Sequence, residues 1–168
     1  MSPSYSRPAP TRRWLLGMAL LCVAAVVTAL VSQHGFDMQP CPWCVLQRLL
    51  FIVIGALALL AAWLPPRAPR AALASVALLL ALAGAMAALY QHFVAAKSQS
   101  CNLTLADRIV GGLGLDHLLP PVFQVTAGCA EAAVDLLGVP YDFWSAALFA
   151  LLAFGAAMAA TRALRNNL

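Results

Sequence analysis

Four long apolar runs dominate the chain, and polar segments separate them. The runs cover residues 14–33, 45–64, 71–90 and 144–161. Each is close to the ~20 residues that an α-helix needs to cross the ~30 Å hydrocarbon core of a bilayer. The pattern therefore predicts an all-α membrane protein whose single domain, residues 1–168, is a four-transmembrane-helix bundle.

The remaining segments are predicted from their polarity and prolines. A secretory signal peptide has an apolar core of ~7–15 residues, shorter than the run 14–33, so we expect the first span to be retained. Pro65-Pro66 cannot continue a helix and indicates a tight turn. The expected connections are a leader at 1–13, a first loop at 34–44, a turn at 65–70, a long second loop at 91–143 and a tail at 162–168.

Composition agrees with a membrane protein. Hydrophobic residues make up 63% of the chain and charged residues only 10%, whereas soluble domains have about 25% charged residues. The net charge of +4 does not indicate a nucleic-acid-binding protein, because the two signs of charge are segregated along the chain.

The charges also predict the orientation. Seven arginines fall on one side of the four-span arrangement: Arg7, Arg12, Arg13, Arg67, Arg70, Arg162 and Arg165. The other side has Arg48, Lys97 and Arg108 and all six acids: Asp37, Asp107, Asp116, Glu131, Asp135 and Asp142. The positive-inside rule places the arginine-rich side, with both termini, in the cytoplasm. Trp14, Trp43, Trp63 and Trp144 fall at span ends, as in an aromatic belt.

Four of the five cysteines lie in the two outward loops. The fifth, Cys22, lies inside the first span and is interpreted as a packing residue. An oxidising compartment allows the others to form disulfides. Four cysteines allow three pairings; proximity favours Cys41–Cys44 and Cys101–Cys129, but the sequence alone does not choose. One structural alternative is a Cys101–Cys129 disulfide that only holds the loop together. A second is a zinc site made of all four cysteines, and the oxidising compartment argues against this zinc site.

The segment Pro40-Cys41-Pro42-Trp43-Cys44-Val45-Leu46-Gln47-Arg48 carries the candidate chemistry. Cys44 falls in the first turn of the second span, where free backbone N–H groups and the helix dipole favour a thiolate. Arg48, four residues later, projects from the same helix face. A thiolate and a guanidinium beside an apolar wall favour redox chemistry with a lipid-soluble partner. Such chemistry needs no metal.

Further candidates lie near this segment. Gln47 neighbours Arg48, and His92 follows the third span at the same membrane face as Cys44, where it can hydrogen-bond a bound carbonyl; an ordinary interfacial histidine is the alternative. In the second loop, Leu105, Ile109, Val110 and Leu113 recur at helical spacing. This pattern predicts an amphipathic helix in the membrane interface, able to tether Cys101 near the bilayer.

These features resemble the disulfide bond formation protein B (DsbB) family. The resemblance rests on four spans, on Cys41-Pro42-Trp43-Cys44 with Gln47-Arg48, and on Cys101 and Gly128-Cys129-Ala130-Glu131 in the second loop. It implies a quinone-dependent thiol:disulfide oxidoreductase of the bacterial inner membrane, with its cysteine loops in the periplasm. The implied partners are a periplasmic DsbA-like thioredoxin-fold oxidase and membrane ubiquinone or menaquinone.

The resemblance also implies residue roles. The partner's thiolate attacks Cys101, Cys129 is released to attack Cys41, and Cys44 becomes the thiolate that meets the quinone ring. Arg48 stabilises that thiolate or the reduced quinone, and His92 matches a family histidine near the quinone. The Cys101–Cys129 bond is then catalytic rather than a staple.

Two other functions remain open on the sequence. A reductase like the quinone-epoxide reductases also uses a C-x-x-C motif in a helix bundle. A non-catalytic four-span adaptor with stapled loops is the alternative from another class.

Overall fold

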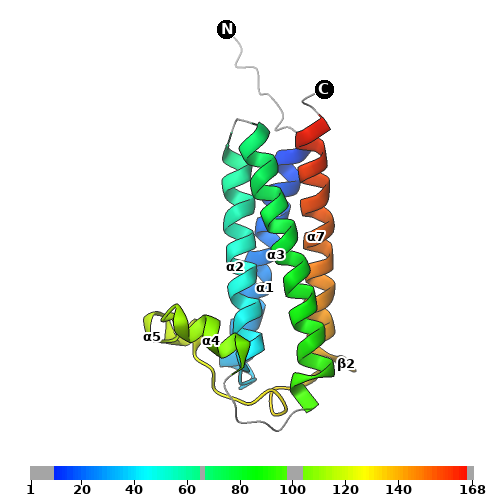
Figure 1. Cartoon of the computed structure of the whole chain (residues 1–168). Coiled ribbons are helices and arrows are strands. Elements are labelled where there is room, and N and C mark those ends of the chain that lie inside the picture. Colours follow the sequence, from blue (N-terminus) through cyan, green and yellow to red (C-terminus); the bar gives the residue numbers. More distant parts are fainter. Residues whose placement is uncertain (1–9, 65–66, 98–103, 166–168) are drawn as a thin grey trace.

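The computed structural model describes residues 10–64, 67–97 and 104–165. Four long helices pack side by side with alternating direction (Figure 1): α1 (Pro10–Gly35), α2 (Pro42–Trp63), α3 (Arg67–Phe93) and α7 (Tyr141–Arg165). All four are long and apolar enough to span a membrane, which confirms the predicted four-helix membrane fold. The first helix begins and the last ends at one end of the bundle, and the cysteine-bearing connections lie at the other.

Some expected features lie outside the described residues. These are residues 1–9 of the leader, Pro65-Pro66 of the turn, residues 98–103 with the catalytic candidate Cys101, and residues 166–168 of the tail.

All four long helices extend beyond the apolar runs at the cysteine end, and α1 continues to Gly35. Helix α2 begins at Pro42 rather than Val45, because proline suits the first helical position and the Cys41 side chain caps the helix by accepting the Cys44 backbone N–H. Helix α3 continues to Phe93, and α7 begins at Tyr141 rather than at residue 144. Polar residues next to the apolar runs therefore sit on the rigid helices.

The second loop folds into short elements that lie mostly at this same end of the bundle (Figure 1). They are the 3₁₀ turn η1 (Ala95–Lys97), helices α4 (Leu105–Gly112), α5 (Leu115–Leu118) and α6 (Pro120–Phe123), and a hairpin of β1 (Asp135–Leu136) and β2 (Val139–Pro140). A capping box between Thr104 and Asp107 starts α4.

Helix α4 has the expected amphipathic pattern. Ala106 and Val110 are buried, and the helix packs on α2. Leu105, Ile109 and Leu113 point outward instead, with exposed fractions of 62%, 37% and 57%. An apolar stripe is therefore free to contact the bilayer surface.

Small residues let α3 and α7 approach closely. Phe149 of α7 is fully buried and stacks on Phe51 of α2, with ring centroids 4.1 Å apart. A Cβ atom on Gly84 would overlap the Phe149 ring, so the ring fits only because residue 84 is a glycine. Small residues permit such close helix–helix packing.

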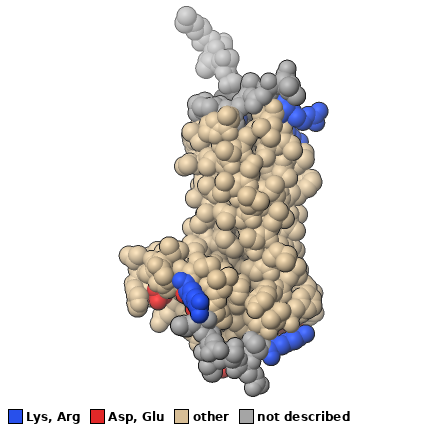
Figure 2. Space-filling view, in the orientation of Figure 1, with Lys and Arg blue, Asp and Glu red and all other residues tan. Residues whose placement is uncertain are grey.

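The molecular surface separates charged residues at the ends of the bundle from apolar residues along its middle. On the face shown in Figure 2, Lys, Arg, Asp and Glu atoms gather towards the two ends of the molecule, and the middle of the bundle has none. Many side chains of the long helices are large, apolar and exposed, including Leu20, Val27, Leu79 and Leu151. Such a belt is expected where helices face lipid.

Candidate redox site

Cys41 and Cys44 meet at the first turn of α2. Cys41 is fully buried, and its sulfur accepts the backbone N–H of Cys44 at 3.2 Å. The two sulfur atoms lie 2.6 Å apart as free thiols in hydrogen-bonding contact. Because α2 fixes both residues, the pair can close to a disulfide with little movement.

Cys129 joins this pair from the second loop. It packs against the buried cluster that contains Cys41, and the two thiols are hydrogen-bonded. That hydrogen bond lowers the pKa of Cys129; partial burial opposes the shift, and a further hydrogen bond with the Trp43 backbone supports it. The pKa of Cys41 is raised by hydrogen bonding to Cys129 and Cys44 and by burial. Cys129 is therefore the better nucleophile of the two, directed at Cys41.

A buried polar cluster adjoins the sulfur of Cys44. The Gln91 Nε2 group donates to Cys44 Sγ at 3.3 Å and to Asp142 Oδ1 at 2.5 Å. The Gln47 Nε2 group donates to Gln91 Oε1 at 2.7 Å. Gln47, Gln91 and Asp142 are 4%, 2% and 6% exposed, so these contacts are shielded from water.

Arg48 lies one turn beyond Cys44 and is 4% exposed. Its Nη1 group donates to Gln33 Oε1 at 2.9 Å and to the Val122 carbonyl at 2.5 Å. Its Nε group is buried and has no hydrogen-bond acceptor among the described residues. A buried donor without an acceptor is costly, so this group is available to donate to an acceptor on a ligand.

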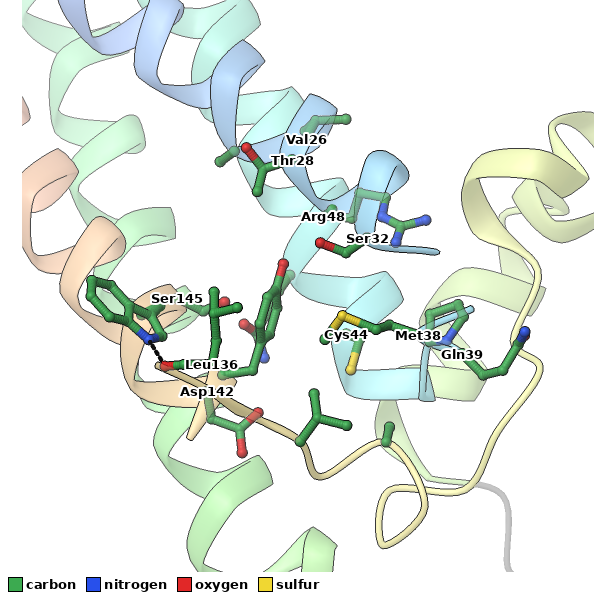
Figure 3. A pocket seen from close by; sticks show the side chains of 18 of the residues that line it. Val26, Thr28, Ser32, Met38, Gln39, Cys44, Arg48, Leu136, Asp142 and Ser145 are labelled. Atoms are coloured by element: carbon green, nitrogen blue, oxygen red, sulfur yellow. Dashed lines mark hydrogen bonds between the residues drawn. The ribbon is translucent and has the colours of Figure 1, made fainter. Parts of the chain in front are cut away.

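A cavity of about 620 Å³ opens beside these residues. Figure 3 shows Cys44 and Arg48 reaching it from α2, with Asp142 and Ser145 from α7. Apolar side chains of α1 and α7, such as Leu21, Ala25 and Leu148, line its wall. Small-molecule sites have this size and this mixture of apolar wall and few polar groups.

The predicted site residues other than His92 fall into three groups. Cys44, Gln47 and Arg48 line the cavity. Cys41 contacts Cys44, and Cys129 packs against the cluster that contains Cys41. Cys101 lies outside the described residues.

The position of His92 is different. Gln91, rather than His92, is the α3 side chain that lines the cavity. His92 is 28% exposed; its ring contacts Phe93 and Phe143, and its Nδ1 atom lies 3.4 Å from Asp142 Oδ2. The quinone-binding role of His92 stays a prediction.

Sequence reasoning missed Gln91, Asp142 and Gln33 as site residues. A signal existed: polar residues beside long apolar runs, at the membrane face of Cys44, are candidates for function. Within the described residues, no group of three or more His, Cys, Asp or Glu side chains forms a candidate metal site. The four-cysteine zinc alternative includes Cys101 and therefore extends beyond them.

The arrangement agrees with comparisons to known proteins. A family model described as "Disulfide bond formation protein DsbB" matches residues 11–159. The chain belongs to the DsbB family. It is 34% identical over 143 residues to disulfide bond formation protein B 1 of Pseudomonas syringae pv. syringae (strain B728a), covering 84% of this chain and 85% of the relative. The corresponding protein of Aromatoleum aromaticum (strain DSM 19018 / LMG 30748 / EbN1) is 33% identical over 156 residues, covering 90% and 93%.

Membership of the DsbB family defines the general activity. The protein is a multi-pass membrane protein and a disulfide oxidoreductase that takes part in disulfide bond formation. The C-x-x-C pair and Cys129 are the described cysteines whose positions suit that activity.

Proposed function

We propose that this DsbB-family protein re-oxidises a periplasmic DsbA-like thioredoxin-fold oxidase and passes the electrons to membrane quinone. Electrons pass through the Cys101/Cys129 pair and then the Cys41/Cys44 pair, which supports disulfide bond formation in exported proteins. The observation that carries the proposal is the chain of contacts from Cys129 to Cys41 to Cys44 and then to the apolar cavity.

The orientation forms part of this proposal. Both termini face the cytoplasm of a bacterial cell and both cysteine loops face the periplasm, across the inner membrane. The charge asymmetry of the loops supports this orientation. The soluble thiol partner is then on the side of the cysteines, and the quinone reaches the cavity from the bilayer.

The cavity fits a quinone, either ubiquinone or menaquinone. Its apolar wall suits a ring and a hydrocarbon tail, and the unpaired Nε–H of Arg48 suits a carbonyl oxygen. Cys44 lies on the same cavity and presents its sulfur to the ligand space. A bound quinone supplies an acceptor for the two electrons and two protons that the dithiol loses.

The residues of this chain perform the exchange steps before that transfer. The partner's thiolate attacks Cys101, which breaks the Cys101–Cys129 bond and leaves the electron pair on Cys129. Cys129 then attacks Cys41 of the Cys41–Cys44 disulfide, and the electron pair passes to Cys44. The lowered pKa of Cys129 favours its thiolate, which is the attacking form.

The test is quinone reduction by the purified protein in detergent, with a reduced DsbA-like protein as electron donor. Turnover should vanish in Cys44→Ser, because the sulfur at the cavity is lost, and should fall at least tenfold in Arg48→Ala. Cys22→Ala and Arg108→Ala are matched controls, because Cys22 packs in the bundle core and Arg108 is exposed on α4. Both controls should keep near-normal turnover.

The proposal fails if the wild-type protein reduces neither ubiquinone nor menaquinone with this donor. The non-catalytic adaptor would then fit better. Electron flow only from quinol to the partner would favour the reductase alternative.

A further inference from the structure

The Gln91 side chain has a hydrogen-bonding partner for every one of its polar groups. Its Nε2 group donates to Cys44 Sγ and Asp142 Oδ1, and its Oε1 atom accepts from Gln47. An amide has two N–H donors and one carbonyl, so these contacts use both donors. Because Gln91 is 2% exposed, water does not compete at this position.

Asp142 fixes the direction of this amide. A carboxylate can only accept hydrogen bonds, so the Nε2 end of Gln91 must face it. A flipped amide would bring the Gln91 oxygen against the carboxylate oxygen and the Cys44 sulfur. Gln47 holds the other end by donating to Gln91 Oε1. His92 holds the second Asp142 oxygen in place, with Nδ1 3.4 Å from Oδ2.

The fixed N–H points at the sulfur that must carry negative charge. When Cys129 attacks the Cys41–Cys44 disulfide, the Cys41–Cys129 bond forms, the Cys41–Cys44 bond breaks, and the electron pair remains on Cys44 Sγ. Preorganised donors aimed at a developing charge favour such a step. Among the described residues, the contacts of the Arg48 Nη1 group go to Gln33 and Val122 rather than to Cys44, whereas the Gln91 amide donates to the Cys44 sulfur directly.

We propose that Gln91 is a catalytic residue that donates its side-chain N–H to Cys44 as this sulfur leaves, and that Asp142 and Gln47 are positioning residues that fix the amide. This inference deepens the proposed function and rests on it for the exchange step. The site around Cys44 of α2 therefore includes Gln91 of α3 and Asp142 of α7.

The first experiment measures the Cys44 thiolate without any quinone. The full chain in detergent, with Cys22→Ala, Cys41→Ser, Cys101→Ser and Cys129→Ser, leaves Cys44 as the single thiol. Its alkylation by iodoacetamide is followed at neutral and at high pH. In Gln91→Leu the rate at neutral pH should fall about tenfold to a hundredfold, the range expected for a hydrogen bond to a charged group. The rate at high pH should not fall, because the thiol is deprotonated in either protein and a thiolate of higher pKa is at least as nucleophilic.

Two substitutions at Asp142 separate positioning from charge. Asp142→Asn keeps an oxygen acceptor for the Gln91 amide and should retain fast alkylation. Asp142→Leu removes the acceptor and should slow alkylation at neutral pH, as Gln91→Leu does. If Asp142 acted only through its negative charge, both variants would speed alkylation, which would overturn its positioning role.

Controls make the result decisive. Gln124→Leu, an exposed glutamine of the second loop, should have no effect. Gln91→Met keeps the side-chain length and serves if the leucine variant does not fold, as judged by circular dichroism. Unchanged neutral-pH alkylation in a folded Gln91 variant overturns the proposal. Quinone reduction by the unsubstituted protein is assayed separately, so its failure would contradict the proposed function alone.

Discussion

The thiol of Cys129 is hydrogen-bonded to the thiol of Cys41, which joins the second loop to the first turn of α2. This contact gives disulfide exchange a direct route between the two loops. The structure thus favours communication between the two predicted cysteine pairs, whose connectivity the sequence left open.

We expect this contact to be trapped as a covalent bond. The variant with Cys44→Ser and Cys101→Ser leaves Cys41 and Cys129 as neighbouring thiols, and mild oxidation with oxidised glutathione should join them. Mass spectrometry of non-reduced peptides identifies the bond. In a control that retains only Cys22 and Cys129, no such bond should form, because Cys22 is buried in the bundle core. Persistent free thiols in the test variant would contradict the contact.

The reactivity of Cys129 should depend on Cys41. Hydrogen bonding to Cys41 lowers the pKa of Cys129, so its thiolate persists as the pH falls below the ordinary thiol value of about 8.5. In a Cys101→Ser background, Cys41→Ala should move the midpoint of Cys129 alkylation upward by about one pH unit. Cys41→Ser retains a hydroxyl donor and should move it less. Equal midpoints in all three proteins would exclude this cause.

The stability of the bundle should depend on the size of the side chain at position 84. A valine there must displace the buried Phe149 ring, and overpacking of this kind costs about 1–3 kcal/mol. Gly84→Val should therefore lower the thermal unfolding midpoint in detergent. Gly17→Val is the matched control, since a Cβ at Gly17 meets nothing within 4 Å. Equal losses at the two positions would show that helix propensity, and not packing, is responsible.

The exposed stripe of α4 should contact lipid. Leu113 is 57% exposed, and we expect Leu113→Trp to add fluorescence that brominated acyl chains quench in lipid nanodiscs. The same variant in unbrominated lipid provides the reference. An added signal that brominated lipid leaves unquenched would place α4 away from the bilayer.

The sequence by itself determined the properties that depend on neighbouring residues. The length of each apolar run defines a span. The charges between the runs predict an orientation, which stays a prediction. The spacing of Cys44 and Arg48 places both on one face of α2, and both line the cavity. The inferences about the spans and about the shared helix face are confirmed, because helix length and helix face depend on residues close together in the chain.

Only the tertiary structure decided which distant groups meet. His92 and Gln91 are adjacent in sequence, yet successive helix residues point about 100° apart, and the packing of α3 turns Gln91 towards Cys44. Asp142 reaches the same site from α7, and Cys129 reaches Cys41 from the second loop. No local pattern specifies these pairs, because the rotation and depth of each helix are set by contacts such as Phe149 on Gly84.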